Sequence, residues 1–170
     1  MKNLTVLAFL VLLVSCQQST KEVVPEIIGY DITEGVKAPL FAGDLANVQV
    51  WEQYIKAHNE KDLQTIQSLN AEKGFKVKGA KGEVFKSSEE HLNFLKNWFE
   101  SDANPKWTTN FLIANTFTTK EGVVKQWVTS GHSLNLLVEG DTLKLNQVHD
   151  ALIVNGKVQE FSVNERIVSE

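Results

Sequence analysis

Residues 142–158 of this chain read Thr-Leu-Lys-Leu-Asn-Gln-Val-His-Asp-Ala-Leu-Ile-Val-Asn-Gly-Lys-Val, and this stretch is the most informative about the fold. A mostly apolar run is followed by Asn155-Gly156, a dipeptide that two-residue hairpin turns favour, and a new run begins at Val158. Further runs rich in Val, Ile, Leu, Thr and aromatic residues lie on the amino-terminal side. Together they predict four long strands of a strongly curved antiparallel sheet: 107–119, 123–138, 142–154 and 158–168.

The residues before these strands have the pattern of three helices. Asp44, Asp62 and Ser87 are predicted N-caps, and each is followed by apolar residues at helical spacing. Glu90 completes a capping box with Ser87. A short strand or hairpin within 75–85 separates the second and third helices. Because helices and strands are segregated along the chain, the sequence predicts an α+β fold. The three helices are expected to cover the concave side of the sheet and leave a cone-shaped cavity.

The amino terminus has the zones of a secretory signal. Lys2 precedes an apolar stretch, 4–14, which is shorter than the roughly 20 residues of a membrane-spanning helix. Leu13-Val14-Ser15-Cys16 follows and resembles a lipobox, which implies acylation of the Cys16 thiol and cleavage before it. We therefore expect 1–15 to be a lipoprotein signal peptide. The protein would be anchored in a membrane of the bacterial cell envelope, facing the periplasm or the cell surface.

The segment 16–43 contains Pro25, Pro39 and three glycines, without a persistent period, and we interpret it as a lipid-anchored tether. The folded domain is then 44–170. Cys16 is the one cysteine, so the acylated chain would have no thiol for a disulfide or a metal. The 17 basic and 21 acidic residues are interspersed without a basic stripe, which gives no support to nucleic-acid binding.

Two segments carry a family resemblance. Residues 54–63, Tyr-Ile-Lys-Ala-His-Asn-Glu-Lys-Asp-Leu, and 155–158, Asn-Gly-Lys-Val, resemble motifs of the SnoaL-like branch of the nuclear-transport-factor-2-like (NTF2-like) superfamily. The resemblance covers about 44–168 and implies a cone-shaped fold. These motifs are structural, because Ala57 permits close helix approach, Asp62 caps a helix and Gly156 permits a turn. They therefore leave the chemistry open.

The resemblance also implies where an isomerase of this superfamily would place its catalytic groups. Tyr54 falls at the position of a tyrosine that donates a hydrogen bond to the substrate. Lys78 stands where the isomerases have a carboxylate base, and His149 stands where they have a second acidic donor. Both carboxylates are missing here, which argues against steroid-isomerase chemistry.

Strand and helix periodicities bring a set of candidate site residues together. Tyr54 and His58 share one helical face, whereas His132 and His149 lie on neighbouring strands. If those strand positions point inward, three imidazoles and a phenol share one cavity. Tyr54, His132 and His149 are the candidate catalytic residues. The predicted pocket residues are Tyr54, His58, Trp98, Trp107, His132, Leu134, Leu136, His149 and Ala151.

Three interpretations of these histidines remain open. They are hydrogen-bonded wall residues of an apolar pocket, or one of them is a general acid–base, or His58, His132 and His149 bind zinc. No local ligand spacing supports the metal site, and we predict neither a metal nor an organic cofactor. His91 is interpreted as a surface residue, and Trp51 and Trp127 as core residues.

Three classes of function follow. The first is a binding module that holds a small, partly apolar ligand. The second is a cofactor-independent enzyme of the SnoaL type, an isomerase, cyclase, dehydratase or hydrolase that uses His and Tyr in acid–base chemistry. The third is a protein-interaction scaffold that forms a homodimer. The missing carboxylates favour the first or the third class over the second. Because 127–137 alternates too unevenly to indicate an exposed apolar sheet face for the third, we favour the binding module.

Overall fold

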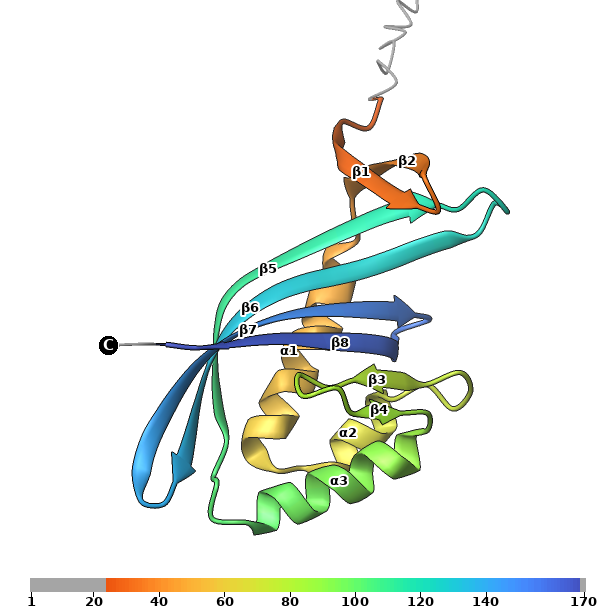
Figure 1. Ribbon diagram of the computed structural model, residues 1–170. Helices are drawn as coiled ribbons and strands as arrows, with labels where there is room; N and C mark the ends of the chain where they lie inside the picture. The colour runs from red at the N-terminus through yellow and green to blue at the C-terminus, as the bar shows by residue number, and fades with distance from the viewer. Residues whose placement is uncertain (1–23, 169–170) are drawn as a thin grey trace, which may run out of the picture.

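The computed structural model describes residues 24–168 and is built around the four long strands that the sequence predicts (Figure 1). These strands are antiparallel neighbours in chain order. Asn155 and Gly156 both have positive φ, at 51° and 71°, as their hairpin turn requires. The strands are β5 (Lys106–Thr118), β6 (Val124–Val138), β7 (Asp141–Val154) and β8 (Lys157–Ile167).

The three predicted helices are present, and the predicted N-caps begin them. The side chains of Asp44, Asp62 and Ser87 each accept a hydrogen bond from a backbone N–H in the first turn. Lys61, in the left-handed region at φ 60°, ends the first helix and turns the chain into the second. The helices are α1 (Leu45–Glu60), α2 (Leu63–Leu69) and α3 (Ser88–Glu100). Within 24–168, no helix is long and apolar enough to cross a membrane.

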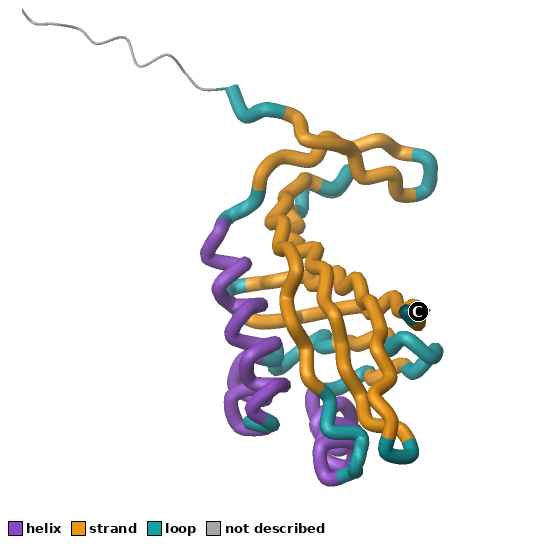
Figure 2. Tube along the Cα trace, turned by 90° about the vertical axis from the view of Figure 1, so that its left-hand side faces the viewer, coloured by secondary structure: helices purple, strands orange, loops and turns teal. Residues whose placement is uncertain are grey.

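The predicted hairpin between α2 and α3 is short and extends the sheet. β3 (Lys76–Lys78) pairs parallel with β8 and antiparallel with β4 (Val84–Phe85). With β1 (Ile27–Thr33) and β2 (Val36–Ala42) before them, the strand order in the described part of the chain is β1-β2-β5-β6-β7-β8-β3-β4. Figure 2 shows the helices on one side of this curved sheet, which is the α+β cone that the sequence predicts.

One segment differs from its prediction. The tether was expected to be irregular up to residue 43, but β1 (Ile27–Thr33) and β2 (Val36–Ala42) form a hairpin. Phe41 and Ala42 of β2 continue the sheet beside β5. The hairpin projects beyond the helices (Figure 1), and much of its apolar surface stays exposed. The expected signal peptide and Cys16 lie outside the described residues.

The helix α1 is fixed to the sheet by buried and part-buried polar contacts. The indole Nε1 of Trp51 donates to Ser130 Oγ on β6 at 2.8 Å. Asn59 at the other end of α1 donates to the backbone oxygen of Trp107 and accepts from its backbone N–H, at 2.9 and 2.8 Å. The hydrophobic core lies entirely between Trp51 and Phe161. A soluble form comprising 17–170 therefore contains every side chain of this core.

Candidate functional site

The space between the helices and the concave face of the sheet contains a cavity of about 450 Å³. Its walls come from α1, α3, the β3–β4 hairpin and the four long strands, and they are mainly aromatic and aliphatic. Lys81 and Glu83, from the loop between β3 and β4, are charged residues of its lining. The apolar lining includes Trp51, Ile55, Val77, Phe85, Leu95, Leu143, Leu145, Phe161 and Val163.

The cavity brings together seven of the nine predicted pocket residues: Tyr54, His58, Trp98, Trp107, Leu134, Leu136 and His149. His132 and Ala151 point to the same side of the sheet but do not line the cavity. Ala151 is completely buried in the core. The ring of His132 packs against that of His149, with centroids 4.5 Å apart. Whether any of these residues binds a ligand stays a prediction.

Gln147 organises the polar part of the wall, and the sequence analysis missed it. Its Oε1 accepts from Trp107 Nε1 at 2.8 Å and from His149 Nε2 at 2.9 Å, while its Nε2 donates to Glu165 at 2.7 Å. The orientation of the amide is fixed because an indole N–H only donates and a carboxylate only accepts. His149 therefore carries its proton on Nε2. Gln147 could have been found from the sequence, since it lies two residues before His149 and so on the same strand face.

Tyr54 does not present a free hydroxyl to the cavity. Its OH donates to Asn70 Oδ1 at 2.7 Å, and Asn70 in turn donates to Ser88 Oγ at 2.8 Å. Burial also raises the pKa of the Tyr54 hydroxyl well above its ordinary value. The hydroxyl that the resemblance assigns to substrate therefore joins α1 to the segments that follow α2 and begin α3.

The prediction that His91 is a surface residue is wrong. Its side chain is buried, and its ring contacts Phe75, Phe85 and Phe161 at centroid distances of 5.5–5.7 Å. The β3–β4 hairpin folds over this face of α3 and covers it. His91 lines the cavity beside His58, with ring centroids 5.9 Å apart.

The four histidines are buried and uncharged at neutral pH. Burial lowers the pKa of His58 and of His132 to about 4, and that of His91 to about 3. Burial lowers the pKa of His149 well below its ordinary value, and neighbouring His132 and His58 add to the effect. In the part of the chain that the structure describes, no group of three His, Cys, Asp or Glu side chains is arranged to hold a metal ion.

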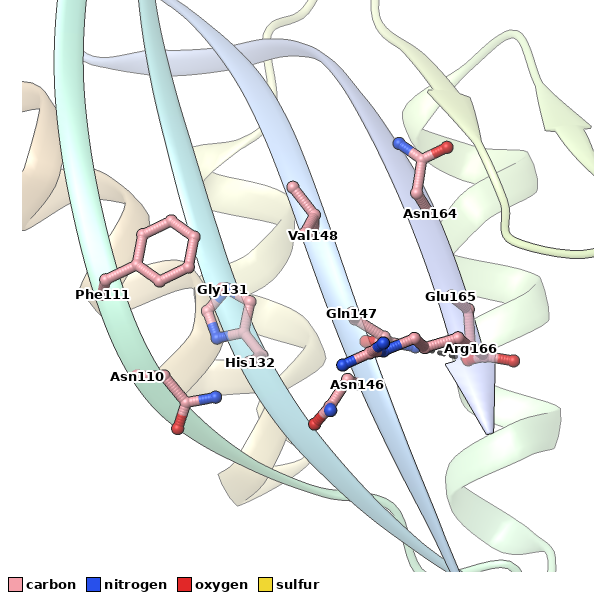
Figure 3. Close-up of a pocket in the computed structure, with 10 residues that line it drawn as sticks. All are labelled: Asn110, Phe111, Gly131, His132, Asn146, Gln147, Val148, Asn164, Glu165 and Arg166. Atoms are coloured by element: carbon pink, nitrogen blue, oxygen red, sulfur yellow. Dashed lines mark hydrogen bonds between the residues drawn. The ribbon is translucent and has the colours of Figure 1, made fainter. Parts of the chain in front are cut away.

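The opposite face of the sheet carries a second, shallower hollow of about 440 Å³ (Figure 3). His132, whose side chain has the parity of the concave side, also borders this hollow, together with Gly131 and three asparagines. Phe111, Ile113 and Val148 lie on this face and are 45%, 51% and 41% exposed. This face therefore has exposed apolar side chains, which the uneven alternation of β6 did not indicate. Homodimer formation stays a prediction.

Trp127 also belongs to this outer face. It is paired with Leu152 across β6 and β7 and is only half-buried, so its prediction as a core residue is wrong. Trp51 is completely buried, as predicted. The two positions differ because Trp51 lies on the helix face that packs against the sheet, whereas Trp127 has the strand parity that points away from the helices.

Comparisons with known proteins agree with this geometry at the level of the fold. No protein-family model matches the chain, and no curated protein matches it. Solved structures do match. A candidate ketosteroid isomerase from Kribbella flavida is 16% identical with a TM-score of 0.58, over 76% of this chain and 84% of that one. An LEH-like epoxide hydrolase from M. tuberculosis is 8% identical with a TM-score of 0.59, over 71% and 83%.

A candidate SnoaL-like polyketide cyclase from Jannaschia sp. is 14% identical with a TM-score of 0.56, over 72% of this chain and 86% of that one. The domain has the NTF2-like fold. At these identities the likeness is one of fold, and chemistry must be argued from the residues of this chain.

The NTF2-like cone places the residues implied by the resemblance as follows. Lys78 lies on β3, is half-exposed and pairs with Glu160 at 3.0 Å. The position at which the isomerases have their carboxylate base therefore holds a lysine that does not line the cavity. His149 lies on β7 in the wall and donates to Gln147. Asp150, next to it, accepts from Thr129 at 2.7 Å on the other face of the sheet, so the two adjacent residues form no dyad.

Proposed function

We propose that the domain is a binding module that holds a small, partly apolar molecule in its conical cavity. The observation that carries this proposal is the cavity itself, which is enclosed mainly by aromatic and aliphatic side chains. A few polar groups stand among them, and Gln147 is fixed by hydrogen bonds to three neighbours. Concave, largely apolar sites with a few oriented polar groups are typical of small-molecule binding. The names of the structural neighbours, an epoxide hydrolase and candidate isomerase and cyclase, also refer to small-molecule chemistry.

The electrostatics of the histidines favour binding over acid–base catalysis. None of the histidines within 24–168 is hydrogen-bonded to a carboxylate that would raise its basicity. A base with a pKa of about 4 or below is a weak proton acceptor at neutral pH, where efficient general bases have pKa values near 7. These rings are therefore suited to hydrogen-bond a ligand while remaining uncharged.

One observation supports an enzyme of the SnoaL type as the second candidate. The carboxylate of Glu165 belongs to the cavity lining and accepts from Gln147, which contacts His149. A carboxylate at a cavity wall is a possible base for proton abstraction without a cofactor. Turnover of ketone, epoxide or hydroxy-ester substrates that is lost in Glu165→Gln would establish this alternative over the binding module.

The binding proposal is tested by native mass spectrometry of the soluble form, 17–170, purified from a bacterial periplasm. We expect a discrete added mass that disappears on denaturation. Leu136→Trp, which places a bulky indole ring in the cavity, should abolish the added mass while circular dichroism shows a folded domain. Val148→Trp, on the opposite face of the same sheet, is the matched control and should retain it. Retention by Leu136→Trp would reject this cavity as the site.

We also propose that the chain is exported and held in the cell envelope by a lipid on Cys16, as the lipobox resemblance implies. This segment lies outside the described residues, so the support comes from the sequence alone. When cells that express the precursor are grown with radiolabelled palmitate, the mature protein should carry the label. Cys16→Ser should not be labelled, and a labelled Cys16→Ser protein would refute the anchor at this residue.

A further inference from the structure

Two histidines on different helices place complementary hydrogen-bonding atoms beside the cavity. His58 on α1 and His91 on α3 are 6% and 3% exposed, and both line the cavity. Their rings lie side by side with centroids 5.9 Å apart. Buried polar groups in proteins are nearly always hydrogen-bonded, so unpartnered ring nitrogens at such a site require an explanation.

His58 offers an acceptor. Its Nδ1 lies 2.8 Å from the backbone oxygen of Tyr54. Because a carbonyl oxygen only accepts, Nδ1 carries the proton of the neutral ring and Nε2 carries the lone pair. Among the described residues Nε2 has no hydrogen-bond partner, yet it is not one of the polar atoms that are closed off from solvent. The lone pair of His58 is therefore open to the cavity.

His91 offers a donor. Its Nδ1 is closed off without a partner among the described residues, within the cluster of Phe75, Phe85 and Phe161. A buried N–H without an acceptor is costlier and rarer than a buried acceptor without a donor, so the ring proton is expected on Nε2. The Nε2 atom is not among those closed off from solvent. His91 therefore presents an N–H to the cavity beside the lone pair of His58.

We propose that the His58–His91 pair binds an uncharged group that both donates and accepts a hydrogen bond, a hydroxyl or an amide, on an otherwise apolar molecule. This names the ligand class of the cavity and rests on the proposed function. A carboxylate would only accept, and an ammonium would only donate. Each would also bring a charge into an apolar site without a counter-charge at this pair. A hydroxyl or amide satisfies both nitrogens at once.

The test compares two isomeric probes, 1-octanol and heptyl methyl ether, by isothermal titration calorimetry on the soluble form 17–170. Both have the same atoms and nearly the same length, but the ether accepts and cannot donate. We expect 1-octanol to bind about tenfold more tightly, since one additional hydrogen bond to a buried group contributes about that factor. Equal affinities for the two isomers would overturn the proposal.

Variants assign the effect to the pair. His58→Phe should remove the acceptor and lower the preference for 1-octanol to about twofold or less. His91→Phe removes the donor and should weaken both probes by a similar factor, because either oxygen can accept from it. His91→Gln keeps an N–H donor and should recover part of the lost affinity. Val148→Ala, on the far face of the sheet, should leave both affinities unchanged. A preference for 1-octanol that persists in His58→Phe would overturn the assignment.

The outcome also separates this inference from the proposed function. Binding of both probes with equal affinity would leave the apolar cavity as the site and reject only the role of the histidine pair. Failure of both isomers and of n-octane to bind would reject the cavity as a ligand site and the pair with it.

Discussion

Replacing His91 by phenylalanine should stabilise the domain, although it removes a buried residue at the centre of the site. His91 lies among three phenylalanine rings with its Nδ1 unpartnered in the described part of the chain. An unsatisfied buried polar atom costs about 1–3 kcal/mol, and an aromatic ring of similar shape does not have this cost. Some of the gain is lost because the six-membered ring is slightly larger than the imidazole. We expect the free energy of unfolding to rise by about 1 kcal/mol at pH 7.5.

The difference should grow as the pH falls. The pKa of His91 is about 3 in the folded protein, whereas an unperturbed histidine has a value of 6.5. Below pH 6.5 the unfolded chain therefore binds a proton that the folded chain does not, and stability decreases on acidification. At pH 5 this one histidine lowers the free energy of unfolding by about 2 kcal/mol, a cost that the phenylalanine variant lacks. The gap between the two proteins should widen from about 1 to about 3 kcal/mol.

The assay is urea denaturation followed by tryptophan fluorescence at pH 7.5, 6 and 5. Lys96→Gln, an exposed substitution on the same helix, serves as the control and should follow the wild-type pH dependence. A His91→Phe variant that is less stable at pH 7.5 and has an unchanged pH dependence would refute the reasoning. It would mean that the imidazole is hydrogen-bonded in the folded protein. A more stable variant with weaker ligand binding would indicate that His91 serves binding at the expense of stability.

Three further substitutions test other contacts. Tyr54→Phe should lower the free energy of unfolding by about 1–2 kcal/mol, since Asn70 loses its buried donor; an unchanged urea midpoint would contradict this hydrogen bond. Asn59→Ala should lower the free energy of unfolding by about 2 kcal/mol, because both backbone groups of Trp107 lose their partner. An unchanged thermal unfolding transition would show that these hydrogen bonds do not form. Gly131→Ala should cost about 1–3 kcal/mol in the same assay, because its Cβ would clash with the ring of Phe111 unless that ring moves. Wild-type stability for this variant would show that the ring moves freely.

The parts of the fold that were predictable depend on local signals. Asp44, Asp62 and Ser87 cap helices through contacts within three residues along the chain, and Asn155-Gly156 fixes a hairpin by its own conformational preference. Strand parity is a local property, and it placed His132 and His149 on the inward faces of β6 and β7 correctly, although Trp127 on β6 was misassigned. These signals were sufficient to predict the cone.

The errors arise where distant segments decide the structure. His91 stands among polar neighbours on α3 and is buried only because the β3–β4 hairpin covers it. The segment 27–42 contains glycine and proline and buries little apolar surface, so its strands depend on pairing with each other and with β5. The hydrogen-bond partners of Tyr54 and Gln147 could likewise not be predicted from the sequence, because Asn70 and Glu165 lie 16 and 18 residues away along the chain.

If the proposed lipid on Cys16 holds the chain at its amino end, the hairpin of β1 and β2 has a mechanical consequence. A pulling force would act on the hairpin at Ile27 and at Ala42, which lie at the same end of the hairpin. Its hydrogen bonds would therefore break one after another, starting from that end. A two-stranded hairpin is marginal in stability, and the pairing with β5 involves only Phe41 and Ala42. Opening it would add on the order of 50 Å of extended chain. The cone behind it, whose core begins at Trp51, would keep its shape while the domain moved further from its point of attachment.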